Sequence, residues 1–227
     1  MDSENTEENP LFKDVYEAKQ KYRICPHEKF DILSYVPVKS ILQKGPQCGL
    51  VAVQMILNTI IPNCDITIEQ IFEKAKTAEY TLNGEMFSTR NLSKLMNDCY
   101  LNKNLGVVSF GTFNEQCIDH LKSGGLLLVP YDADGNHSPC LKKGHKAHWA
   151  VINGLVLVGE KLLVTARHGK SKHLAIWELD ELLASNSQLE EFSPDRNASN
   201  VPYIVPESGL GGPDGLKNLC IFIKPSL

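Results

Sequence analysis

Three features are missing from this sequence, and each absence excludes a class of protein. No apolar stretch approaches the ~20 residues of a membrane-spanning helix, which argues against an integral membrane protein. The seven cysteines are odd in number and include no C-x-x-C pair, so a disulfide framework is not expected. A formal net charge of −4 provides no basic field of the kind that attracts nucleic acid.

The first residues, MDSENTEENP, are acidic and polar, unlike a signal peptide. We therefore expect a cytoplasmic location, where the cysteines stay reduced. Because this stretch has few apolar side chains, we expect disorder over about residues 1–10. A helical pattern is possible over 11–22, and we group residues 1–30 as a flexible acidic tail. The length and the lack of internal repeats favour a single folded domain over residues 31–227.

The hydrophobic pattern changes its period half-way along the chain. In the first half, apolar residues recur at helical spacing over 48–60, 65–80, 88–100 and 114–125. In the second half, short apolar and β-branched runs occupy 126–131, 148–158, 161–166, 173–177 and 219–224. Helices followed by strands indicate an α+β fold, with a helical N-terminal half packed on an antiparallel sheet.

Cys48 occupies an unusual place within the stretch QKGPQCGLVAVQMILNTI, residues 43–60. It follows a Gly-Pro turn and opens a predicted helix, where backbone N–H groups and the helix dipole favour a thiolate. Most cysteines are simply small buried residues. The glycines on both sides of Cys48 indicate an exposed helix start, which favours the interpretation as a nucleophile.

A thiol nucleophile needs a base within reach and donors for the developing oxyanion. His148 opens the run 148–158, a hundred residues after Cys48, so its imidazole is expected at a sheet edge facing the helix N-terminus. Among the upstream glutamines, Gln43 can fold over the thiol more easily than the adjacent Gln47. We therefore predict Gln43 as an oxyanion donor and place Gln47 among the substrate-binding residues.

No residue is assigned as the group that orients His148. The strand that returns beside it, 161–177, contains no Asp, Asn or Glu. Arg167 is a cation, and His168 could serve only as a neutral acceptor. Asp132 is a more distant candidate, and a backbone carbonyl or a water is an equal alternative.

A zinc site competes with the catalytic interpretation of the same region. Four potential ligands fall within twelve residues: His137, Cys140, His145 and His148. Their spacing matches no common zinc motif, and His148 is better explained as the start of a strand. We therefore expect neither a metal nor another cofactor.

Several motifs resemble known peptidases. LQKGPQCGLVAVQMIL and GHKAHWAVINGLVL resemble the papain-like C39-type cysteine peptidases. GPQCGL, AHWAV, RHGKSKHLAIW, SNSQLEEFSP and YIVPESGLGGP are more similar to the family of animal actin maturation proteases, over about residues 33–223. The resemblance implies a papain-like fold with Cys48 as nucleophile and His148 as base. It also implies removal of an N-acetylated first residue, Met or Cys, from immature actin.

The chain departs from both families in one respect each. The C39-type pattern places an Asp after the hairpin of the histidine, and this chain has none there. The actin-processing relatives of vertebrates carry a proline-rich N-terminal segment associated with profilin binding. Residues 1–30 contain only Pro10 and Pro26, so profilin is not expected as a partner.

Charges near the predicted base suit the acidic N-terminus of actin. Lys142, Lys143 and Lys146 directly precede the base, and Arg167 and Lys170 lie on the returning strand. Cations near the cleft would attract an acidic segment, and the first four are predicted to bind substrate. A solvated basic loop explains them equally well. An acetylated residue has no free amine that needs a carboxylate partner, and no carboxylate is evident near Cys48.

Two other functions stay open at this point. One is a papain-like peptidase or amide hydrolase with a different peptide substrate. The other is a catalytically silent domain that binds actin, for which the missing Asp is an argument.

Overall fold

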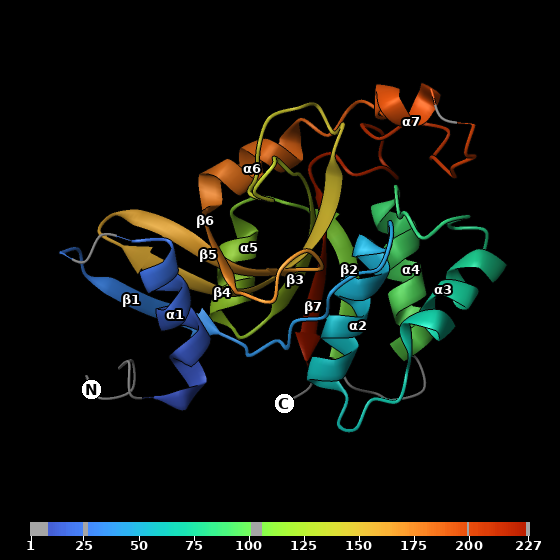
Figure 1. The fold of residues 1–227 in the computed structure, drawn as a ribbon. Coiled ribbons are helices and arrows are strands. Elements are labelled where there is room, and N and C mark those ends of the chain that lie inside the picture. The colour runs from blue at the N-terminus through green and yellow to red at the C-terminus, as the bar shows by residue number, and fades with distance from the viewer. Residues whose placement is uncertain (1–8, 25–26, 101–105, 199, 226–227) are drawn as a thin grey trace.

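An antiparallel sheet forms the centre of the protein (Figure 1). The computed structural model describes residues 9–24, 27–100, 106–198 and 200–225. The strands are β1 (Phe30–Tyr35), β2 (Gly106–Thr112), β3 (Leu126–Asp132), β4 (Ala147–Val158), β5 (Lys161–His168), β6 (Ala175–Glu178) and β7 (Leu219–Pro225). They form a seven-stranded sheet in the order β2-β7-β3-β4-β5-β6, and β1 pairs with the second half of β4.

Helices cover both faces of this sheet. They are η1 (Pro10–Phe12), α1 (Lys13–Lys21), α2 (Cys48–Ile60), α3 (Ile68–Thr77), α4 (Thr89–Tyr100), α5 (Gln116–Lys122), α6 (Leu179–Ser187) and α7 (Pro194–Ala198). Figure 1 shows α2, α3 and α4 gathered together, away from α1 and β1. The predicted α+β architecture, helices on an antiparallel sheet, is confirmed. None of the helices in the described ranges has the length and apolar character needed to cross a membrane.

The strands β3 and β4 show why their sequences are almost continuously apolar. Side chains alternate between the two faces of a strand, so neighbours enter different cores. Leu128 and Val151 pack in the core under α2, whereas Val129 and Ile152 pack in the core on the opposite face. Both faces of these strands are therefore buried, which explains their mostly apolar sequences.

Two of the predicted helices have local signals that explain their bounds. The helix α2 starts at Cys48 and stops before Pro62, which cannot continue the hydrogen-bond ladder. The helix α3 starts with a capping box, in which the Thr67 hydroxyl accepts from Gln70 N–H and the Gln70 side chain accepts from Thr67 N–H. Both confirm the helical prediction for the first half.

The N-terminal region differs from the prediction of a flexible tail over 1–30. Val15, Tyr16 and Ala18 of α1 are buried, in a small core with residues of β1, β4, β5 and β6. The segment has a negative mean hydropathy because its outer face is charged, yet its apolar residues fall on one side of the helix. Residues 1–8 lie outside the described ranges. The bounds 31–227 for the peptidase domain stay a prediction.

Candidate active site

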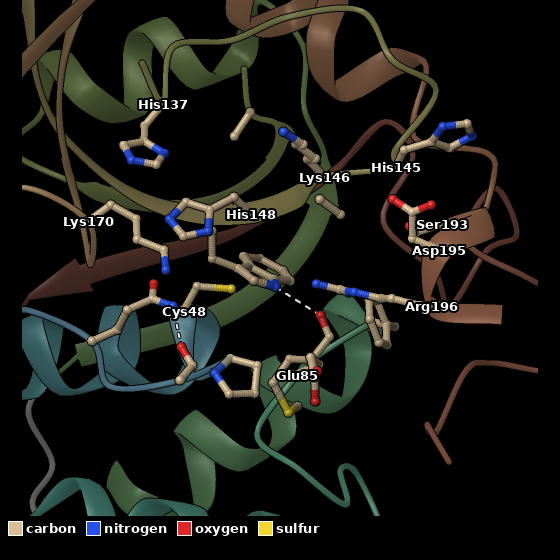
Figure 2. A pocket seen from close by; sticks show the side chains of 18 of the residues that line it. Cys48, Glu85, His137, His145, Lys146, His148, Lys170, Ser193, Asp195 and Arg196 are labelled. Carbon is tan, nitrogen blue, oxygen red and sulfur yellow. Dashed lines mark hydrogen bonds between the residues drawn. The ribbon is translucent and has the colours of Figure 1, made fainter. Parts of the chain in front are cut away.

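A cleft of about 570 Å³ lies where the N-terminus of α2 meets the start of β4. Cys48 and His148 both line it, and Figure 2 shows their side chains in the middle of the cleft. The two residues come from elements a hundred positions apart in the sequence. The sheet and α2 thus bring together a thiol and an imidazole in one solvent-accessible site.

Cys48 is held at the start of α2 by close packing on β4. It is the first helical residue, and only 9% of its surface is exposed. Gly49 allows the close approach, because a Cβ there would lie 3.1 Å from Met86 Cβ and 3.2 Å from Trp149 Cδ1. Burial raises the pKa of the Cys48 thiol, although a hydrogen bond from the Trp149 backbone and the charge of Arg196 oppose this effect.

His148 is a buried and neutral imidazole. Burial, followed by the charges of His168 and Lys170, lowers the pKa of His148 to about 3. Its Nε2 atom has no hydrogen-bond partner among the described residues. An imidazole with this pKa is unprotonated at neutral pH, so its ring carries a free lone pair.

A second imidazole lies beside the base. The ring centroid of His168, the last residue of β5, is 5.9 Å from that of His148. The same ring stacks on Trp177 at 5.9 Å, and its Nδ1 atom accepts the backbone N–H of Lys170 at 3.4 Å. Burial lowers the pKa of His168 to about 4, so this ring is also neutral. The returning strand therefore supplies an imidazole, not a carboxylate, to the neighbourhood of the base.

Asp132 does not act as a partner of His148, which removes it as a candidate orienting group. Tyr131 is the residue paired with His148 across β3 and β4, so the adjacent Asp132 faces the other side of the sheet. The fully buried Asp132 carboxylate accepts the backbone N–H groups of Lys142, Gly144 and Lys146 at 2.6–3.0 Å. Its role is to fix the loop that leads into β4.

The two glutamines upstream of Cys48 take different places. Gln43 lines the cleft, and its Nε2 donates to the carbonyl of Gly45 at 2.6 Å. Its backbone N–H donates to the carbonyl of Gly169 at 2.8 Å, which fastens the loop to the end of β5. The side chain of Gln47 packs against Gly84 instead and is not among the cleft-lining residues.

Comparison with known proteins shows which family the chain belongs to. The profile of the family described as actin maturation protease-like, C-terminal domain, matches residues 38–156, which contain both Cys48 and His148. The "Actin maturation protease" of Drosophila melanogaster is 41% identical over 204 residues, covering 89% of this chain and 74% of the relative. The chain belongs to the actin maturation protease-like family. It is therefore a peptidase.

Two further comparisons differ in what they establish. The "Actin maturation protease" of Mus musculus is 34% identical over 86% of the chain, which spans 64% of the length of that relative. A solved structure, a putative C39-like peptidase from Bacillus anthracis, has a TM-score of 0.53 at 13% identity, covering 86% of this chain and 98% of that one. The structural likeness shows the fold alone and confirms the prediction of a papain-like C39-type architecture.

The predicted substrate-binding cations of this actin maturation protease-like chain are not all in the cleft. Lys146 lines it, but Lys142 and Lys143 do not, and the Lys143 ammonium pairs with Glu191 at 2.9 Å. The Arg167 side chain is 5% exposed and forms an ion pair with Asp14 of α1. Its role is to join α1 to the sheet, because its guanidinium points away from the cleft.

Four charged residues line the cleft that the sequence analysis did not place there: Glu85, Asp134, Asp195 and Arg196. Lys170, which the sequence analysis grouped with Arg167 on the returning strand, lies two residues after the end of β5 and lines the cleft. Arg196, on α7, packs over the rings of Phe87 and Tyr203 at 5.2 and 5.9 Å. Glu85 contradicts the expectation that no carboxylate lies near Cys48, and no local sequence signal reveals it.

The alternative zinc ligands do not converge. His145 pairs with Glu191 at 2.9 Å, away from the ring of His148. The rings of His137 and His148 are near one another, with centroids 6.5 Å apart. Within the described part of the chain, no group of three or more potential ligands is arranged to hold a metal ion.

Proposed function

We propose that this protein is a cysteine-type aminopeptidase that removes the acetylated first residue of actin. The observation that carries the proposal is the presence of Cys48 and His148 in one cleft. The name "Actin maturation protease" of the relatives supports actin as the substrate. The acidic N-terminal segment of actin is the part that the site would bind.

Catalysis proceeds through a thioester. Cys48 attacks the carbonyl carbon of the acetylated residue while His148 accepts the thiol proton. The C–N bond then breaks as His148 returns this proton to the leaving amine, which becomes the new N-terminus. A water, deprotonated by His148, attacks the thioester and releases the acetylated amino acid together with the Cys48 thiol.

Gln43 and the backbone N–H of Cys48 form the proposed oxyanion hole. An amide nitrogen carries two hydrogens, so donation from Gln43 to Gly45 leaves one for the oxyanion. The hydrogen bond between Gln43 N–H and Gly169 holds the loop in place before substrate arrives. A donor fixed in advance needs no reorganisation when negative charge develops.

Lys146 and Lys170 are the cations that we assign to the acidic part of the substrate. Both line the cleft, and Figure 2 shows Lys170 beside His148. His148 must reach the leaving amine, so the residues that follow the cleaved bond lie on this side. We leave Gln47, Lys142, Lys143 and Arg167 out of the proposed contacts, because they do not line the cleft.

Mass spectrometry of an acetylated actin N-terminal peptide tests the proposal. Wild-type protein should remove one acetylated residue, and Cys48→Ala should leave the peptide intact. Cys64→Ala is the matched control, because Cys64 is a partly exposed thiol outside the cleft and its loss should not change cleavage. If wild-type protein leaves both the peptide and full-length acetylated actin intact, the proposal is wrong.

A further inference from the structure

Glu85 is fixed close to the nucleophile by packing of its own segment. The indole N–H of Trp149 donates to the carbonyl of Met86 at 2.9 Å, and Met86 also contacts the start of α2 at Gly49. On the other side, Gly84 adopts φ +110 and lies against the side chain of Gln47. The backbone on both sides of Glu85 is therefore tied to β4, which carries His148, and to the start of α2, which carries Cys48.

The carboxyl group of Glu85 lacks a hydrogen bond that the protein would normally provide. The residue is 8% exposed, and its Oε2 atom has no hydrogen-bond partner among the described residues. Leaving a buried carboxyl oxygen without a donor is costly. Because Glu85 lines the cleft, a donor on a bound substrate can supply the missing hydrogen bond.

The charges in the cleft orient the substrate. In Figure 2, Cys48 and His148 lie between Lys170 on one side and Glu85 and Arg196 on the other. The acidic residues after the cleaved bond suit the side of Lys170, as the proposed function requires. The acetylated residue then extends from Cys48 towards Glu85.

The first residue of the substrate offers a single N–H donor, that of its acetylated amide. This nitrogen is bonded to the Cα that carries the reacting carbonyl, so a side chain that contacts it must lie next to the nucleophile. We propose that a carboxyl oxygen of Glu85 accepts this N–H and thereby positions the acetylated residue for attack by Cys48. The inference rests on the proposed function and deepens it, by naming the residue that recognises the acetylated amide.

Arg196 contributes to the same recognition. Burial raises the pKa of Glu85. A hydrogen bond from the backbone of Glu85 itself, followed by the nearby charge of Arg196, opposes that rise and supports the acceptor form of the carboxyl group. The guanidinium is oriented by its packing over Phe87 and Tyr203.

A double-mutant cycle between enzyme and substrate tests the role of Glu85. The two peptides have the same acidic sequence, one with an acetylated first methionine and one with the amide N–H of that residue replaced by an ester oxygen. For wild-type protein, loss of the N–H should lower kcat/KM about 10- to 100-fold, as expected for a hydrogen bond to a carboxylate. For Glu85→Ala, the two peptides should be cleaved at equal rates within about twofold.

Controls separate this inference from the proposed function. Glu73→Ala removes an exposed glutamate from α3, outside the cleft, and should discriminate between the peptides as wild-type protein does. If Glu85→Ala does not fold, Glu85→Met carries the same test, because it keeps the chain length and lacks an acceptor. If either Glu85 variant still prefers the amide peptide over the ester peptide as strongly as wild-type protein does, the proposed role of Glu85 is wrong. The proposed function is unaffected by that result. If wild-type protein cleaves neither the acetylated peptide nor actin, the proposed function and the role of Glu85 are both wrong.

Discussion

The ring of His168 meets the ring of His148 edge-on, with an angle of 74° between their planes. Both rings are buried, and the pKa of each is lowered by that burial. A carboxylate at this place would favour a protonated base and, with it, a preformed thiolate–imidazolium pair. A neutral imidazole does not, so the resting state here is a neutral thiol beside a neutral base.

The first prediction concerns the reactivity of Cys48 as a function of pH. Burial raises the thiol pKa above its ordinary value and lowers that of His148 to about 3, so both groups are uncharged between these values. The rate of Cys48 alkylation by iodoacetamide should rise continuously up to and beyond pH 9. Cys48→Ala provides the background from other cysteines. A plateau between pH 5 and 8 would instead reveal an ion pair.

The second prediction concerns the residue that orients the base. Replacing His168 by Asp places an acidic group beside His148, which should raise the pKa of His148 and favour its protonated form. Alkylation of Cys48 at pH 6 should then become faster than in wild-type protein. His168→Asn adds no charge, so it should not speed the alkylation of Cys48 at pH 6. It should lower kcat about tenfold, because the ring of His148 loses a packing partner. If the alkylation of Cys48 depends on pH in the same way in both variants and in wild-type protein, residue 168 does not influence the protonation of His148.

The third prediction tests the cation at the leaving-group side. Lys170→Ala should raise KM for an acidic acetylated peptide about 3- to 10-fold, because an ionic contact in a cleft is lost. Added salt should reduce the difference from wild type, since it screens the contact. Lys172→Ala is the control, as its exposed side chain lies outside the cleft. The assignment fails if Lys170→Ala weakens cleavage equally for a peptide with amides in place of its carboxylates.

The fourth prediction separates stability from substrate binding at Arg167. Its buried guanidinium also donates to the carbonyl of Lys172 at 2.9 Å, in addition to pairing with Asp14. Arg167→Ala should lower the free energy of unfolding by about 2–4 kcal/mol, measured by urea denaturation, because it removes this network. The value of KM should stay within about twofold of wild type. A large rise in KM with an unchanged free energy of unfolding would instead indicate that Arg167 binds the substrate.

Local patterns predicted the elements that carry the reacting groups. The apolar run after Cys48 and the Thr67 cap identify α2 and α3, and the run from His148 identifies β4, because each signal lies within one element. The strand β2 and the helices α6 and α7 were not predicted. β2 contains two glycines and a serine, and the short α6 contains two serines and an asparagine, so neither has a strong periodic signal.

The rest of the site depends on packing between distant segments. Glu85 and Arg196 reach the cleft from a loop and a short helix whose places are set by contacts with Trp149, Phe87 and Tyr203. No spacing rule connects such residues to Cys48. The same reason explains why Arg167 was assigned to the substrate, since its partner Asp14 lies in a helix expected to be a tail.

The Asp132 carboxylate binds the loop before β4 through backbone N–H groups alone. Lys142 and Lys146 therefore contribute their main chain to the framework, while their side chains have no part in it. The charge of the loop can change without moving the base. Side-chain substitutions in this loop should therefore leave the position of His148 intact, with proline, which lacks the N–H, as the exception.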